Sequence, residues 1–207
     1  MPDPPLCSQA FRQTMPKTGS TIRRLAFLPA PDRLDPPAAE VHVWRGGLDE
    51  PLQRVLSRYL GLPAAEIRLL GGAHGKPRLA DPGGDLRFNL SHSGTLALVA
   101  ISRGREVGVD VEQTKPWRDF PALAERALDP GDAEAVRAAS GDDQARIFYE
   151  LWTRHEARLK CLGVGLTGAA PRPAPPIAVA EVPIDAGFAA AVAVEGEAVP
   201  LRCWTLD

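Results

Sequence analysis

Val107-Gly108-Val109-Asp110-Val111-Glu112 alternates valines with a glycine and two acidic residues. Because successive side chains of a β-strand point to opposite faces, this pattern predicts a strand with one apolar face and one face that carries Asp110 and Glu112. The two acidic residues are expected roughly 7 Å apart along the backbone. A solvated strand shows the same alternation, but Gly108 on the polar face would let a ligand approach the backbone.

A second motif, Trp152-Thr153-Arg154-His155-Glu156-Ala157-Arg158-Leu159-Lys160, has helical character. Thr153, Glu156 and Lys160 are spaced three and four residues apart, so they share one face of the predicted helix. A Glu–Lys pair one turn apart is commonly a surface ion pair. Two strand carboxylates with a third carboxylate and a lysine nevertheless match what a divalent cation bridging phosphates requires. Together the motifs predict an Mg²⁺-dependent enzyme that acts on a phosphate-containing substrate.

Composition excludes several classes of protein. The chain has 207 residues, enough for one domain or two small lobes, and a net charge of -2 provides no global basic field for nucleic acid. Its 3 cysteines are scattered and form no disulfide framework or Cys-x-x-Cys site, which favours a reducing, cytoplasmic compartment. No segment is long and apolar enough to span a membrane. We therefore expect neither a nucleic-acid partner nor a membrane association.

Periodicity predicts an α+β fold with strands and helices in both halves. Residues 1–38 contain 8 prolines and little periodicity, so we expect a flexible tail. One helix should end at Gly61, a second should start at Asp129-Pro130, and a third should run from about residue 142 to Gly163 or Gly165. Strands are expected over residues 40–44, 86–90, 96–101, 107–112, 177–182, 188–194 and 201–204, the last three as closing antiparallel strands.

Two short segments are candidates for phosphate contacts. Ser91-His92-Ser93-Gly94 lies between two predicted strands, where a turn of small residues would expose backbone N–H groups to an anion. An ordinary hairpin turn has the same composition. Gly75-Lys76-Pro77 is equally ambiguous, since it would either hold a phosphate or simply reverse the chain.

These four motifs, followed by Gly163-Val164-Gly165-Leu166, occur in an order that resembles the 4′-phosphopantetheinyl transferases of the surfactin-type, pseudo-dimeric class. The resemblance covers roughly residues 40–207. It implies two similar α+β lobes related by a pseudo-twofold axis, with the active site between them. The implied division is an N-terminal lobe over residues 39–103 and a C-terminal lobe over residues 104–207 that carries the metal site.

The resemblance also implies an activity. Such enzymes transfer the 4′-phosphopantetheine group of coenzyme A to a serine of an apo acyl or peptidyl carrier protein, with Mg²⁺, and release adenosine 3′,5′-bisphosphate. Two lobes in one chain also suggest a monomer. The implied residues are Asp110, Glu112 and Glu156 for the metal, Glu156, Lys160 and Asp110 for catalysis, and Gly75, Lys76, Pro77, Ser91, His92 and Lys160 for coenzyme A.

Two departures from the family pattern leave other functions open. The helix motif has His155 where the family usually has lysine, and Trp44–Glu50 runs almost directly into the first helix, where relatives carry a longer basic segment. We therefore expect weaker coenzyme A binding than in full-length relatives. One alternative is a non-catalytic relative that binds a carrier protein or coenzyme A, and another is an unrelated metal-dependent phosphohydrolase.

Overall fold

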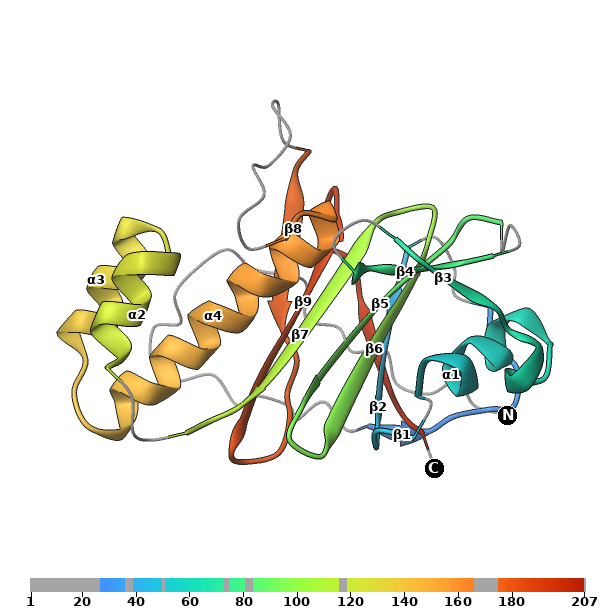
Figure 1. The fold of residues 1–207 in the computed structure, drawn as a ribbon, viewed down its shortest axis with the longest axis horizontal. Helices are drawn as coiled ribbons and strands as arrows, with labels where there is room; N and C mark the ends of the chain where they lie inside the picture. Colours follow the sequence, from blue (N-terminus) through green and yellow to red (C-terminus); the bar gives the residue numbers. More distant parts are fainter. Residues whose placement is uncertain are drawn as a thin grey trace.

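The computed structural model describes residues 27–35, 39–49, 51–72, 75–80, 84–115, 119–165 and 175–206. The described residues form a mixed α+β fold in which sheets occupy the middle of the molecule and helices lie at both ends (Figure 1). The α+β prediction is confirmed. The strands are β1 Leu28–Pro29, β2 Val41–Gly46, β3 Leu69–Gly71, β4 Pro77–Leu79, β5 Leu86–Ser93, β6 Leu96–Arg103, β7 Val107–Gln113, β8 Ile177–Glu181, β9 Phe188–Glu195 and β10 Leu201–Thr205. The helices are α1 Pro51–Leu60, the 3-10 helix η1 Ala64–Glu66, α2 Phe120–Ala127, α3 Pro130–Ala138 and α4 Asp142–Leu162.

The larger sheet has the strand order β1-β10-β2-β6-β5. β6 pairs antiparallel with both β2 and β5, whereas β10 lies between β1 and β2 and runs parallel to both. The predicted antiparallel pairing of residues 201–204 is therefore wrong. Local sequence cannot reveal this, because the partner of Trp204 is Trp44, at the other end of the chain.

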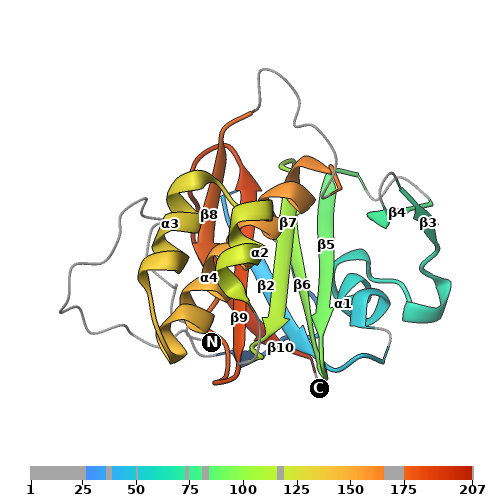
Figure 2. The same cartoon turned by 60° about the vertical axis from the view of Figure 1, so that its left-hand side comes forward.

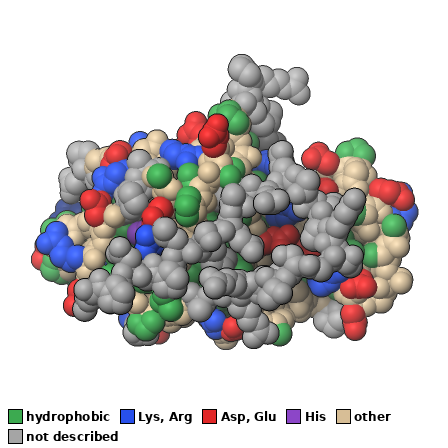
Figure 3. Space-filling view, turned by 180° about the vertical axis from the view of Figure 1, so that it is seen from behind, with side chains coloured by type: hydrophobic (Ala, Val, Ile, Leu, Met, Phe, Trp, Pro, Cys, Tyr) green, Lys and Arg blue, Asp and Glu red, His purple; other side chains and the backbone are tan. Residues whose placement is uncertain are grey.

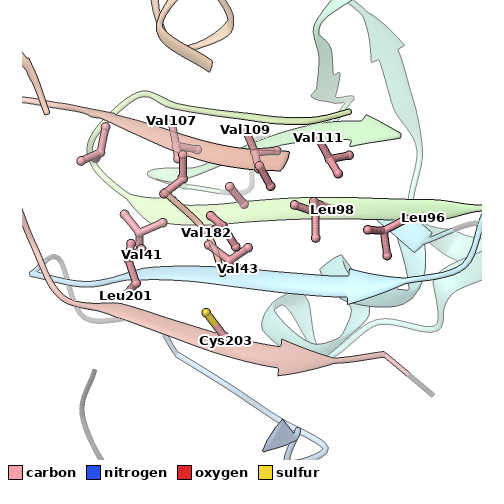
Figure 4. Packing of buried hydrophobic residues seen from close by; sticks show 14 residues of the cluster. Val41, Val43, Leu96, Leu98, Val107, Val109, Val111, Val182, Leu201 and Cys203 are labelled. Atoms are coloured by element: carbon pink, nitrogen blue, oxygen red, sulfur yellow. The ribbon is translucent and has the colours of Figure 1, made fainter. Parts of the chain in front are cut away.

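The smaller sheet has the order β7-β9-β8, with antiparallel pairing throughout. Val107, Val109 and Val111 are fully buried and point toward the first sheet, where they share one core with residues of β2, β6 and β10 (Figure 4). The opposite face of β9 packs through Ala191 and Ala193 against α4. The two faces predicted for residues 107–112 are therefore confirmed.

The long helix α4 crosses the outer face of the smaller sheet, and α2 and α3 pack beside its first half (Figure 2). It ends at Gly163, whose left-handed backbone, φ 69°, favours glycine and caps the helix. A cluster that includes Phe120, Phe148 and Tyr149 joins the three helices. This packing fixes the direction of α4, and hence of the residues on its inner face.

The chain passes from the larger sheet to the smaller one at the turn between β6 and β7, close to the predicted division at residues 103 and 104. However, β10, from the predicted C-terminal lobe, lies in the first sheet. Within the predicted tail, Leu28–Pro29 forms a short strand, and residues 1–26 lie outside the described part. None of the described helices could cross a bilayer. On the face seen in Figure 3, acidic and basic side chains are interspersed.

Candidate active site

The candidate site lies where β5, β7 and α4 meet. β5 is the last strand of the larger sheet and β7 the first of the smaller one, and the two are joined by hydrogen bonds from backbone N–H groups of β7 to side chains of β5. We call this junction the seam. α4 covers its outer side through contacts with β7 and β9. Two strands and one helix therefore fix the residues that face one another here.

Asp110 and Lys160 form a largely buried ion pair at the centre of the seam. Lys160 Nζ lies 2.6 Å from Asp110 Oδ1 and 2.9 Å from Ser91 Oγ, and the Ser91 hydroxyl also donates to Asp110 Oδ1 at 2.9 Å. Asp110 is 3% exposed. Burial raises the pKa of the Asp110 carboxyl, while the Lys160 ammonium and the Ser91 hydroxyl act in the opposite direction.

Glu156 extends this cluster. Burial raises the pKa of Glu156, and the negative charges of Asp110 and Glu112 raise it further, whereas Lys160 lowers it. Asp110 Oδ2 and Glu156 Oε1 are both buried without a hydrogen-bond partner among the described residues. Buried polar atoms normally have a partner, so two such carboxylate oxygens in one site fit a cation ligand.

The carboxylates of this cluster do not form a complete set of metal ligands by themselves. Within the described ranges, no three His, Cys, Asp or Glu side chains are grouped closely enough to hold an ion. Asp110 Oδ1 is already paired with Lys160, and Glu112 Oε2 already accepts from Ser93. The donor chemistry nevertheless fits Mg²⁺, which takes one or two carboxylates together with substrate phosphate oxygens.

Gly108 has a different role from the one predicted. A Cβ atom at this position would lie 2.1 Å from the carbonyl oxygen of Ala157 and 2.4 Å from the nitrogen of Cys161. Gly108 therefore lets the backbone of α4 approach β7, rather than a ligand. The prediction was wrong about the occupant of that space, because the strand pattern alone does not show which element covers it.

Lys76 ties the β3–β4 hairpin to the end of α4. Its ammonium donates to Glu106 Oε2 at 2.8 Å, to the Val107 carbonyl at 3.2 Å and to the Lys160 carbonyl at 3.1 Å. Gly75 has φ 80°, in the left-handed region, and Pro77 begins β4. The Gly75-Lys76-Pro77 segment therefore lies next to Lys160, and its ammonium already has three acceptors in the protein.

Ser91-His92-Ser93 is strand rather than turn. These residues complete β5, and the chain reverses only at Gly94, whose φ is 60°. Strand alternation directs Ser91 and Ser93 toward β7, while His92 is exposed and points away from them. The predicted anion-binding turn is therefore wrong, and the structure separates His92 from Ser91.

His155 lies on a different side of α4 from Glu156 and Lys160. It is half-buried, and its ring centroid is 6.4 Å from that of Trp152. Burial lowers its pKa, with the charges of Asp129 and Asp132 at the start of α3 opposing the change. His155 thus belongs to the α3–α4 packing, in agreement with its place on the apolar stripe of the sequence.

The sequence did not indicate the roles of Asn89 and Ser93 beside β7. Asn89 Oδ1 accepts from the Val109 N–H at 2.9 Å, and the Ser93 hydroxyl donates to Glu112 Oε2 at 2.9 Å. The signal that could have found them is the polar alternation Asn89-x-Ser91-x-Ser93, which has the same period as the carboxylate strand.

Comparison with known proteins identifies the family of this chain. The 4′-phosphopantetheinyl transferase superfamily model matches residues 106–203. The 4′-phosphopantetheinyl transferase HetI of a Nostoc species is 31% identical over 179 residues, which cover 68% of this chain and 76% of that protein. The chain belongs to the 4′-phosphopantetheinyl transferase family. Two further relatives are matched over about half their length: Sfp of Bacillus subtilis (33% identical; 56% of this chain, 50% of Sfp) and AcpT of Escherichia coli (36%; 53% and 55%).

The matched region includes β7, α4 and β9, and so contains every carboxylate of the candidate site. Residues 47–50 form the connection between β2 and α1 in this member of the family. The β5 residues of the seam lie outside the matched range. The superfamily model thus matches the half of the chain that carries Asp110, Glu112, Glu156 and Lys160, while the match to HetI covers 68% of the chain.

Proposed function

We propose that this protein transfers 4′-phosphopantetheine from coenzyme A to a serine of an apo acyl or peptidyl carrier protein. The observation that carries the proposal is the convergence of Asp110 and Glu112 from β7 with Glu156 and Lys160 from α4, where two buried carboxylate oxygens have no partner. The relatives HetI, Sfp and AcpT are 4′-phosphopantetheinyl transferases, which supports the same reaction. The proposal includes the two-lobe interpretation, with the seam as the boundary between lobes.

The reaction forms a bond between the serine oxygen and the phosphorus that carries pantetheine. The bond from that phosphorus to the other phosphate breaks, and adenosine 3′,5′-bisphosphate leaves. In the proposal, Asp110, Glu112 and Glu156 hold Mg²⁺. When bound, Mg²⁺ would neutralise charge on the pyrophosphate, which favours displacement at phosphorus.

Glu156 is the proposed acceptor of the serine proton, directly or through a water molecule. Its pKa is raised by burial and by Asp110, which brings a carboxylate nearer to the range where a general base works best. Lys160 would stabilise the negative charge of the pyrophosphate and of the leaving group. Its Nζ already lies among the carboxylates, at 2.6 Å from Asp110.

Coenzyme A is proposed to lie along the open edge of the seam, against Gly75, Lys76, Pro77, Ser91 and His92. Lys76 is anchored to the last turn of α4, so a phosphate bound by this hairpin would lie close to Lys160. Ser91 is buried beneath Asp110, whereas His92 is exposed and accessible to a ligand. Arg45 is held by Asp185, which limits its availability for the 3′-phosphate.

The test is incubation of the purified protein with coenzyme A, Mg²⁺ and a panel of apo carrier proteins, followed by intact mass measurement. We expect a gain of one phosphopantetheine arm on at least one carrier, which a chelator abolishes. No mass gain on any carrier, with the protein folded, would contradict the proposal. A mass gain that is insensitive to chelator would contradict the metal site alone.

A non-catalytic relative is the second candidate. The observation in its favour is the short connection of residues 47–50 between β2 and α1, where relatives of the resembled class carry a longer basic segment. It predicts binding of coenzyme A or a carrier protein with no transfer. Calorimetric binding to an apo carrier that gains no mass would favour it.

A further inference from the structure

The seam is closed by side chains rather than by a backbone ladder. Three alternate N–H groups of β7 donate to three alternate side chains of β5: Val109 to Asn89 Oδ1 at 2.9 Å, Val111 to Ser91 Oγ at 3.3 Å and Gln113 to Ser93 Oγ at 3.0 Å. Each pair is separated by 20 residues in the chain. The side chains of β5 therefore set the register of the carboxylate strand.

The two serines do more than accept these N–H groups. A hydroxyl has one donor hydrogen and two acceptor lone pairs. In Ser93 the Gln113 N–H occupies a lone pair, and the hydrogen is directed to Glu112 Oε2 at 2.9 Å. Ser91 Oγ likewise accepts from the Val111 N–H and donates its hydrogen to Asp110 Oδ1.

Ser93 fixes which oxygen of Glu112 remains available. Glu112 is half-buried and has three side-chain torsions, and ordering them when a ligand binds costs free energy. A rigid neighbour that already orders the side chain lowers this cost. The Ser93 bond engages Oε2, so Oε1 is the oxygen of Glu112 that this contact leaves for a ligand. Because antiparallel pairing with β6 holds β5 in place, the position of the Ser93 side chain is fixed.

We propose that Ser93 is a positioning residue that orients Glu112 for cation binding. The proposal rests on the metal site of the proposed function. Ser91 is less suited to a test, since its hydroxyl also contacts Lys160 and an alteration there would change two partners at once. Outer hydrogen-bond partners of ligating carboxylates typically affect metal affinity by about tenfold or more.

The experiment measures Mn²⁺ binding without coenzyme A or carrier protein, by the electron paramagnetic resonance signal of free Mn²⁺. Ser93→Ala should weaken binding about tenfold, and Ser93→Thr, which retains the hydroxyl, should bind within about twofold of the wild type. The matched control is Asn89→Ala, which removes a contact of the seam that involves no carboxylate. It should lower thermal stability and leave the Kd for Mn²⁺ unchanged.

The results distinguish a positioning role of Ser93 from a purely structural contact and from a change of strand register. Equal affinities of Ser93→Ala and the wild type would overturn the positioning role, even if the variant melts earlier, since a purely structural contact would change stability alone. Weaker binding in Ser93→Ala and Asn89→Ala to the same degree would also overturn it, because register would then be the cause. A wild-type protein that transfers phosphopantetheine without binding Mn²⁺ would overturn the metal site and this inference together, while leaving the transferase activity intact.

Discussion

Two buried polar clusters in this protein differ in the charge that they carry. In the larger sheet, Trp44 Nε1 donates to Tyr59 Oη at 2.7 Å, and Tyr59 Oη lies 2.8 Å from His42 Nδ1. Burial lowers the pKa of His42 to about 4, so all three groups are neutral near pH 7. We call this the aromatic cluster. The three side chains meet at Tyr59 Oη, while His42 Nε2 is buried without a hydrogen-bond partner among the described residues and lies 3.5 Å from Glu40 Oε2.

The carboxylate cluster of the seam has the opposite character. Asp110, Glu156 and Lys160 are charged groups in a desolvated place, and Asp110 Oδ2 and Glu156 Oε1 are left without a partner. Desolvated charges lower stability unless a ligand or partner compensates them. We infer that the aromatic cluster stabilises the fold. The carboxylate cluster instead lowers stability and keeps oxygen atoms available for a ligand.

The largest effect is expected for Asp110→Asn. The amide keeps the shape and the Ser91 contact but loses the charge, so transfer should fall about 1,000-fold or more. Thermal stability should fall, because the partly buried Lys160 ammonium loses its charged partner. Intact mass time courses and thermal unfolding measure the two effects, and a soluble variant with near-normal transfer would show that the carboxylate cluster is structural.

Lys160→Met should reduce transfer about 100-fold, since an ammonium close to the reacting phosphates is lost. Loss of the ammonium also removes the charge that lowers the pKa of Asp110. The control is Lys115→Met, at an exposed position two residues beyond β7. Equal transfer rates for the two variants would remove Lys160 from the mechanism.

Tyr59→Phe tests the aromatic cluster. It leaves Trp44 Nε1 and His42 Nδ1 without their shared partner, so the free energy of unfolding should fall by about 1–3 kcal/mol. The transfer rate of the folded protein should not change. Urea denaturation gives the stability, and a large loss of transfer with no loss of stability would reverse the roles of the two clusters.

The aromatic cluster should also respond to pH. The pKa of His42 is lowered from 6.5 to about 4 by burial, so between these values the unfolded chain binds more protons than the native one. The stability that His42 contributes is present above about 6.5 and is lost as pH falls through about 4. The free energy of unfolding of the wild type minus that of His42→Gln, measured from pH 7 to pH 4, should fall in this window. A flat difference would contradict a neutral, buried His42.

His155→Lys should have the smallest effect. His155 lies beside Trp152 and near the start of α3, away from the carboxylate cluster, so transfer should change by less than about threefold. Thermal stability should fall modestly, because a charged side chain replaces a half-buried ring in the α3–α4 packing. A rate increase of tenfold or more would place position 155 within reach of the phosphates and enlarge the carboxylate cluster to include it.

Sequence predicted the parts of the site whose pattern is local. The faces of β7 and the shared side of Glu156 and Lys160 follow from periods of two and 3.6 residues, and both are present in the structure. The role of Gly108 could not be predicted, because the element that fills the space beside it is 49 residues away, at Ala157. The contact of Ser93 with Glu112 was not predicted for the same reason, since it depends on which strand lies next to β5.

Strand β10 has a consequence for the order in which the chain acquires structure during synthesis. Its residues complete the larger sheet between β1 and β2, and Trp204 packs 6.3 Å from Trp44, so this sheet is complete only after residue 205 has left the ribosome. All the carboxylates of the seam emerge earlier. At about 5–20 residues per second, the interval from residue 160 to residue 205 is a few seconds, during which β2 has an unpaired edge open to other nascent chains.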